Sequence, residues 1–203
     1  MLNKEQAAKI ERAVSEAEAA TASEIAVCVL RAAGDDRGVA AIVGALAFAL
    51  VDGFGTSIWW NISPLIWIGV AFVTAVAVFL ACDRFDLGLR LLPARLLVKD
   101  ARRAARAVFL DQGLDTVAER NAVLLFVARA ERYVEILPDR AAAAAIDPAR
   151  WAEIVEAFRQ QVRSADVGDA VAGAVAKIGA VCAVPFPAGA GNPDTLPNRP
   201  IQS

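Results

Sequence analysis

One run of 45 residues in the middle of the chain, GVAAIVGALAFALVDGFGTSIWWNISPLIWIGVAFVTAVAVFLAC (38–82), contains a single charged residue, Asp52. A helix rises about 1.5 Å per residue and the hydrocarbon core of a bilayer is about 30 Å thick, so about 20 apolar residues are needed to span it. Residues 62–82 supply 21 uncharged residues, with Pro64 in the first turn, where a proline is tolerated. This segment predicts a membrane-spanning helix.

The first part of the run is less decisive, because only 14 uncharged residues precede Asp52. It spans a bilayer if Asp52 lies at the far headgroup layer, and Trp59, Trp60 and Trp67 suit an interfacial aromatic belt near that turn. We therefore interpret 38–82 as a transmembrane hairpin with helices at about 38–54 and 62–82. The alternative is a single span beside a buried or re-entrant helix.

Basic residues set the orientation of this hairpin. Seven of them lie between Asp83 and Arg106 against three aspartates, whereas the connection 52–61 has none, so the positive-inside rule places both chain termini in the cytoplasm. The residues that we assign to the membrane surface are Arg84, Arg90, Arg95, Lys99, Arg102 and Arg103. Leucines interleave with Arg90 and Arg95, which fits a segment lying on anionic headgroups. Alternatively, these basic residues only enforce the topology.

The flanking segments read as one water-soluble domain. A hairpin returns the chain to its starting side, so residues 1–37 and 83–187 can fold together, with 188–203 as an irregular, proline-rich tail. The apolar runs EIAVCVL (24–30) and NAVLLFVA (121–128) predict buried strands that pair in parallel across a helix from Ala94 to about Phe109, which ends at Gly113. A strand in ERYVEILPD (131–139) follows after a two-residue turn, Arg129-Ala130.

Helix-start signals complete the fold prediction. Asn3 with Gln6 forms a capping-box pattern, Asp147-Pro148 begins a helix with an apolar stripe, and Asp166 opens the last helix. We predict an α/β fold: a small open sandwich with a mixed, mostly parallel sheet of about three to four strands flanked by helices and interrupted by the transmembrane hairpin.

Composition excludes several functions. The absence of histidine removes Ser-His-Asp and Cys-His catalysis and most imidazole metal sites. A net charge of −2 offers no basic field for nucleic acid, and neither a Walker A loop nor a GxGxxG motif is present. Cys28, Cys82 and Cys182 form no CxxC pair and are interpreted as structural thiols.

Five residues near the predicted strand ends are the candidate cleft: Glu24, Arg120, Asn121, Asp139 and Arg140. Without histidine, a hydrolase would need carboxylates as nucleophile, acid or ligands of a hard cation, and Glu24 and Asp139 are the candidates. Arg120 with Asn121 would suit an anion. The structural alternative is that Glu24 and Asp139 are surface charges or local caps, and that Arg120 and Asn121 end a helix and turn a strand. We predict no bound metal or other cofactor, with a divalent cation such as calcium as the alternative.

The order of segments resembles the TPM domain family and, within it, a membrane-anchored bacterial branch. The segments that carry the resemblance are TASEIAVCVL, the hairpin, LDTVAERNAVLLFVARAERYVEILPDR and the Phe186-Pro187 step that ends the domain. Two departures stand out: the strand entry Arg120-Asn121-Ala122 lacks the family's usual glycine, and Asp139-Arg140 replaces an acidic-glycine step.

The resemblance implies an open α/β sandwich, and it links relatives to acid phosphatase activity, calcium binding and the maintenance of membrane complexes. We expect a module on the cytoplasmic face of a bacterial inner membrane. It would contact the bilayer and a membrane-protein partner or a second copy, without nucleic acid and without defined catalysis. The alternative is a phosphatase-like hydrolase or divalent-cation-binding protein that uses Asp139 and Glu24.

Overall fold

The structure is a computed structural model that describes residues 2–34, 37–58, 63–85, 93–189 and 199–202. The chain divides into two compact units, one made of 1–33 with 100–203 and the other of 34–99. Helices α2 (Arg37–Ile58) and α3 (Pro64–Phe85) belong to the second unit, and helix α5 (Ala94–Asp111) begins there. Each unit is taken by itself below.

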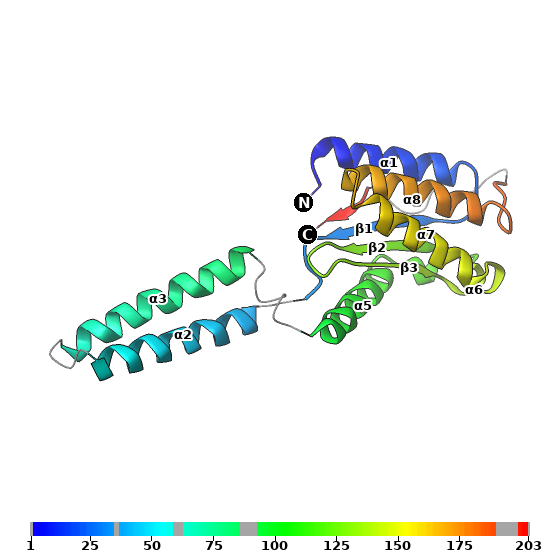
Figure 1. Cartoon of the computed structure of the whole chain (residues 1–203). Helices are drawn as coiled ribbons and strands as arrows, with labels where there is room; N and C mark the ends of the chain where they lie inside the picture. The colour runs from blue at the N-terminus through cyan, green and yellow to red at the C-terminus, as the bar shows by residue number, and fades with distance from the viewer. Residues whose placement is uncertain (1, 35–36, 59–62, 86–92, 190–198, 203) are drawn as a thin grey trace. The chain divides into compact units, whose positions relative to one another are not determined.

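The first unit contains a four-stranded sheet of order β3-β2-β1-β4 (Figure 1). Strand β1 (Ile25–Leu30) pairs in parallel with β2 (Val123–Ala128), which pairs antiparallel with β3 (Tyr133–Pro138). Strand β4 (Ile201–Gln202) pairs in parallel with Cys28 and Val29 of β1. The predicted mixed, mostly parallel sheet flanked by helices is confirmed, and so is the parallel pairing of β1 with β2.

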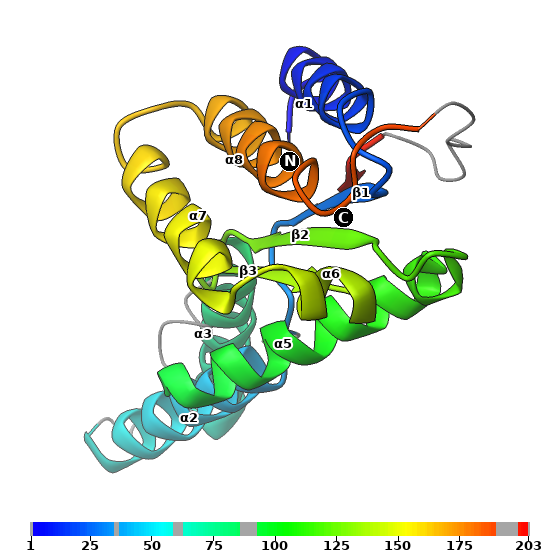
Figure 2. The same cartoon turned by 90° about the vertical axis from the view of Figure 1, so that its right-hand side faces the viewer.

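Helices cover both faces of this sheet. Helices α1 (Lys4–Glu18), α7 (Pro148–Gln161) and α8 (Val167–Cys182) lie on one face and α5 lies on the other (Figure 2). The strands are apolar on both sides, as their composition predicts: Leu125 of β2 packs beneath α1, α7 and α8, whereas Phe126 packs toward Ala101 and Ala105 of α5.

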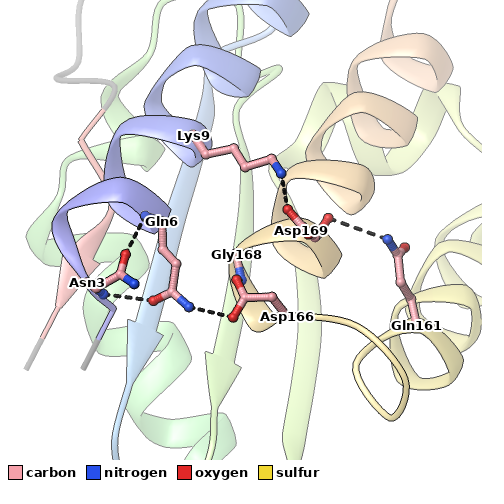
Figure 3. Close-up of polar contacts among 7 residues, drawn as sticks. All are labelled: Asn3, Gln6, Lys9, Gln161, Asp166, Gly168 and Asp169. Carbon is pink, nitrogen blue, oxygen red and sulfur yellow. Dashed lines mark hydrogen bonds and ion pairs between the residues drawn. The ribbon is translucent and has the colours of Figure 1, made fainter.

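Three helix N-termini are capped as the sequence predicts. Asn3 and Gln6 form the reciprocal capping box of α1, Asp147 caps α7 beside Pro148, and Asp166 caps α8. The same polar groups join α1 to α8, since the Gln6 amide donates to Asp166 at 2.6 Å and Lys9 pairs with Asp169 (Figure 3).

Two local predictions are wrong, and one helix was not predicted. The β2–β3 loop has four residues, 129–132, because the register joins Ala128 to Tyr133 and not Ala128 to Glu131. The tail prediction is wrong at its end, where β4 adds to the sheet. The sequence reading also missed α6 (Arg140–Ala145), a helix of alanines capped by Asp139.

The second unit holds the two apolar helices α2 and α3, which pack side by side (Figure 1). A Cβ atom on Gly44 would lie 3.1 Å from the Ala75 carbonyl oxygen, so this glycine permits the close approach. One stretch of the described residues, Leu65–Arg84, is long and apolar enough to cross a membrane, and Gly38–Phe54 is apolar but shorter. A transmembrane hairpin therefore stays a prediction, as do the domain boundaries built on it.

Candidate functional site

The predicted cleft residues gather at the edge of the sheet where β1 and β2 begin and β3 ends. The Glu24 carbonyl accepts a hydrogen bond from the Val123 amide at 2.8 Å, and the Asp139 amide donates to the Ala122 carbonyl at 2.8 Å. These bonds close the sheet at that edge. Glu24, Asn121 and Asp139 are buried, whereas Arg140 is exposed.

Asp139 is held by two neighbours. Its Oδ1 accepts a hydrogen bond from the Arg140 amide at 2.7 Å, which caps α6, and its Oδ2 lies 3.2 Å from the Arg120 Nε. Arg120 has a left-handed backbone (φ 53°), which places its carbonyl as acceptor for the Ala141 amide at 2.9 Å. One carboxylate oxygen of Asp139 thereby caps α6, and the other is buried and faces Arg120 as an ion pair without meeting the geometry of a hydrogen bond.

Asn121 joins the two parallel strands at their start. Its Nδ2 donates to the Ala22 carbonyl at 2.9 Å, and its side chain is fully buried. Its Oδ1 is buried without a hydrogen-bond partner among the described residues. Arg120, Asn121 and Asp139 thus each have a structural role. This favours the interpretation that they cap helices and form turns over the interpretation that they act as nucleophile or general base. A catalytic role for Asp139 and Glu24 stays a prediction.

No group of three or more carboxylates or thiols within the described ranges lies close enough together to hold a metal ion. The thiols of Cys28 and Cys182 are buried, and burial raises the pKa of each to about 11. They are therefore protonated near neutral pH, and they contribute to packing as small apolar groups.

The basic residues assigned to a membrane surface fall into two sets. Arg95, Lys99, Arg102 and Arg103 are exposed along α5, and Arg84 is exposed at the end of α3. Arg102 Nε lies 3.6 Å from Glu135 and Arg103 lies 3.9 Å from Asp100, both weak surface pairs. Arg90 lies outside the described residues.

A second site, which the sequence reading missed, lies at the other end of the same strands. A pocket of about 600 Å³ opens where β2 ends and β3 begins, beside the end of α7 and the start of α8. Four arginines line it: Arg129, Arg132, Arg159 and Arg163. Two of them lie in the β2–β3 loop, and the other two are four residues apart, Arg159 in the last turn of α7 and Arg163 just beyond its end, so their spacing in the sequence did not indicate a shared site before the fold was known.

The comparisons identify the class of this fold. The structure is an open α/β sandwich, and its sheet begins before a helical insertion and continues after it. Residues 94–181 match the TPM domain. This part of the chain is a TPM domain, which confirms the resemblance over those residues. Strand β1 lies before the matched residues yet pairs with β2, so the folded domain extends beyond them.

One solved structure supports the fold. The NMR structure of the BA42 protein from the psychrophilic bacterium Bizionia argentinensis superposes with a TM-score of 0.63 at 17% identity, covering 100% of this chain and 96% of that one. At this identity the likeness concerns the fold alone. No curated protein matches the chain in sequence at a significant level.

Proposed function

We propose that the chain is a membrane-anchored TPM module that binds or assembles partners at the cytoplasmic face of the membrane. The observation that carries the proposal is the outer surface of α2 and α3. Large apolar side chains there are 41–80% exposed: Ile42, Leu46, Leu50, Phe54, Leu65, Ile66, Ile68, Val70, Phe72, Val73, Val76 and Leu80. Soluble proteins rarely leave so much contiguous apolar surface in water.

The lengths of the two helices support the same proposal. Each helix has 22 residues, which at about 1.5 Å per residue gives roughly 33 Å, close to the thickness of the hydrocarbon core. Asp52 is six residues from the end of α2, so a bilayer around the pair would place this carboxylate near one interface. Basic residues at the end of α3 and along α5 suit the opposite, cytoplasmic interface.

Cysteine accessibility in intact cells tests the anchor and its orientation. Thr56→Cys, in the predicted outer turn, should react with a membrane-impermeant maleimide, whereas Glu16→Cys, on the exposed face of α1, should react only after cell lysis. The background is low because all three native cysteines are buried.

The matched pair also defines the contrary results. Reaction of Glu16→Cys in intact cells would reverse the topology, and recovery of the chain in the soluble fraction after lysis would refute the anchor. Reaction of neither variant before lysis, with the chain still in the membrane fraction, would favour a helix pair that enters the bilayer from the cytoplasmic side without crossing it, because β1 and β2 pair in one sheet and must lie on one side.

A further inference from the structure

We propose that the arginine pocket at the end of β2 binds a protein segment in which an apolar side chain is flanked by carboxylates. The proposal rests on the proposed function in one respect, since it names the chemistry of the partner that the module would bind. The pocket lies wholly within the first unit.

The floor of the pocket is apolar. Val127 of β2, Val134 of β3 and Phe158 of α7 are buried, and Val162 and Val167 at the α7–α8 connection are half-buried. These residues belong to, or pack against, the core beneath α1, α7 and α8. An apolar side chain entering the pocket would therefore meet an apolar surface already in place.

The positive charge of the rim is not balanced by any acidic residue of the described lining. The four arginines of the rim are exposed. Only Arg159 has an ion pair in the described chain, a surface contact of 3.9 Å to Glu156. Glu131, the acid of the same hairpin loop, does not line the pocket, and its carboxylate accepts a hydrogen bond from the Ala33 amide at 2.7 Å.

Backbone strain supports a use for Arg132. Its φ of 53° is the left-handed conformation that glycine adopts freely and that a residue with a Cβ adopts at a cost. The hairpin would close at lower cost with glycine there, yet the position holds an arginine whose side chain lines the pocket. Strain of this kind is concentrated at functional positions.

The chemistry favours a protein segment over a small metabolite. Small-molecule sites use a few fixed, partly buried polar groups, whereas this floor is built from valines and Phe158, and its polar groups are long, exposed side chains on the rim. Tyr133 does not supply such a group, since its hydroxyl donates to Glu135 at 2.7 Å. An apolar centre with an arginine-rich rim is typical of protein interfaces, and guanidinium groups pair bidentately with carboxylates.

Fluorescence anisotropy on the full chain in dodecyl maltoside micelles tests the proposal. The probe is a labelled peptide Asp-Glu-Phe-Asp-Glu, compared with Asp-Glu-Ala-Asp-Glu, which lacks the apolar side chain, and with Lys-Lys-Phe-Lys-Lys, which reverses the charge. We expect saturable binding that is tightest for the acidic peptide with phenylalanine, weaker for the acidic peptide with alanine and weakest for the basic peptide. The affinity for the acidic peptides should fall as salt is added. Equal affinity for all three peptides, or no saturable binding of any, would overturn the proposal.

Variants assign the binding to the pocket. Arg132→Gly and Arg163→Gln should each lower the affinity for the acidic peptide about two- to fivefold, the range expected for the loss of one exposed ion pair. Arg12→Gln, an exposed arginine of α1 that does not line the pocket, is the charge-matched control and should leave affinity unchanged. Arg132→Gly should not lower the thermal midpoint, which separates lost binding from lost folding. Loss of affinity in Arg12→Gln equal to that in the pocket variants would reduce the effect to net charge.

A lipid headgroup is the competing ligand. Soluble dihexanoyl phosphatidylglycerol should compete only weakly with the acidic peptide. If it displaces the peptide at lower concentration than unlabelled peptide does, the pocket is a lipid site and the proposal is wrong. A negative result in these binding experiments does not bear on the membrane anchor, because cysteine labelling of α1 and of the hairpin turn tests the anchor separately.

Discussion

At the scale of residues, two arginines with the same left-handed backbone stand at the two ends of β2. Arg120 precedes the strand and Arg132 is the last residue of the loop after it, each with a φ of 53°. Arg120 is held by its 3.2 Å contact with the buried Asp139, whereas Arg132 has no ion pair in the described chain. The cost of the first backbone conformation is offset within the fold, and that of the second is not.

Replacing each arginine by glycine should therefore have opposite effects. Arg132→Gly relieves a strain of about 1–2 kcal/mol and adds a backbone-entropy cost of about 0.5–1 kcal/mol, so the free energy of unfolding should rise by about 0.5–1 kcal/mol. Arg120→Gly gains the same relief but leaves the buried Asp139 without its cation, which costs about 1–3 kcal/mol, so the free energy of unfolding should fall by about 0.5–2 kcal/mol. Denaturant unfolding followed by Trp fluorescence measures both, and equal changes would contradict this account.

At the scale of elements, prediction from the sequence succeeded where the signal was local. Apolar runs located β1 and β2, and Asn3, Asp147 and Asp166 located three helix starts. It failed where a distant partner decides the structure. Two residues after a proline-rich segment form β4 because they pair with β1. Helix α6 is a different case, because its signals are local: Asp139 is a favourable N-cap and alanine has the highest helix propensity, and neither was used to predict it.

The candidate sites divide in the same way. The candidate residues Glu24, Arg120, Asn121, Asp139 and Arg140 lie near strand ends at one edge of the sheet, because parallel strands begin at one edge, and their role as a functional site stays a prediction. The sequence could not show that Asp139 is occupied by a cap and an ion pair, because both partners depend on side-chain and backbone geometry. It missed the arginine pocket because α7 meets the hairpin loop only in the folded chain.

The contact between α1 and α8 gives a prediction at this scale. A Cβ atom on Gly179 would lie 2.6 Å from the Cβ and 3.1 Å from the Cα of Ala17, so Gly179→Ala forces the helices apart. We expect the free energy of unfolding to fall by about 1–3 kcal/mol. Gly173→Ala on the same helix is the matched control: it meets only the flexible end of Gln161, and its gain in helix propensity of about 1 kcal/mol should dominate. Thermal unfolding by circular dichroism compares the two, and an equal loss in both would show that the close approach is not needed.

At the scale of the whole molecule, the chain crosses from one compact unit to another and returns. The chain leaves the first unit after β1 and returns to it before β2, which pairs with β1 so that Ile25 lies beside Val123 and Leu30 beside Ala128. Because β1 is buried between β2 and β4, its pairing depends on residues about a hundred positions away and not on the insertion itself.

Removing the insertion should therefore release a folded domain. When a flexible Gly/Ser linker replaces residues 37–85, we expect the shortened chain to leave the membrane fraction, since the exposed apolar surface of α2 and α3 goes with it. Amide exchange should remain slow across Ile25–Leu30, because this strand keeps its partners on both sides. Rapid exchange there, with slow exchange across β2 and β3, would show that β1 needs the insertion to join the sheet.

Val27→Asp in the same shortened chain is the control. It distinguishes slow amide exchange that is caused by folding from slow amide exchange that is caused by aggregation. Val27 is 3% exposed and packs in the core beneath α1, α7 and α8, so an uncompensated carboxylate there should lower the free energy of unfolding by about 3–5 kcal/mol. Exchange across β1 should then become fast while the chain stays in solution. If exchange stays slow in this variant, protection in the parent reflects association between chains, and the native pairing of β1 would need another test, such as a disulfide between cysteines introduced at the paired positions Val27 and Leu125.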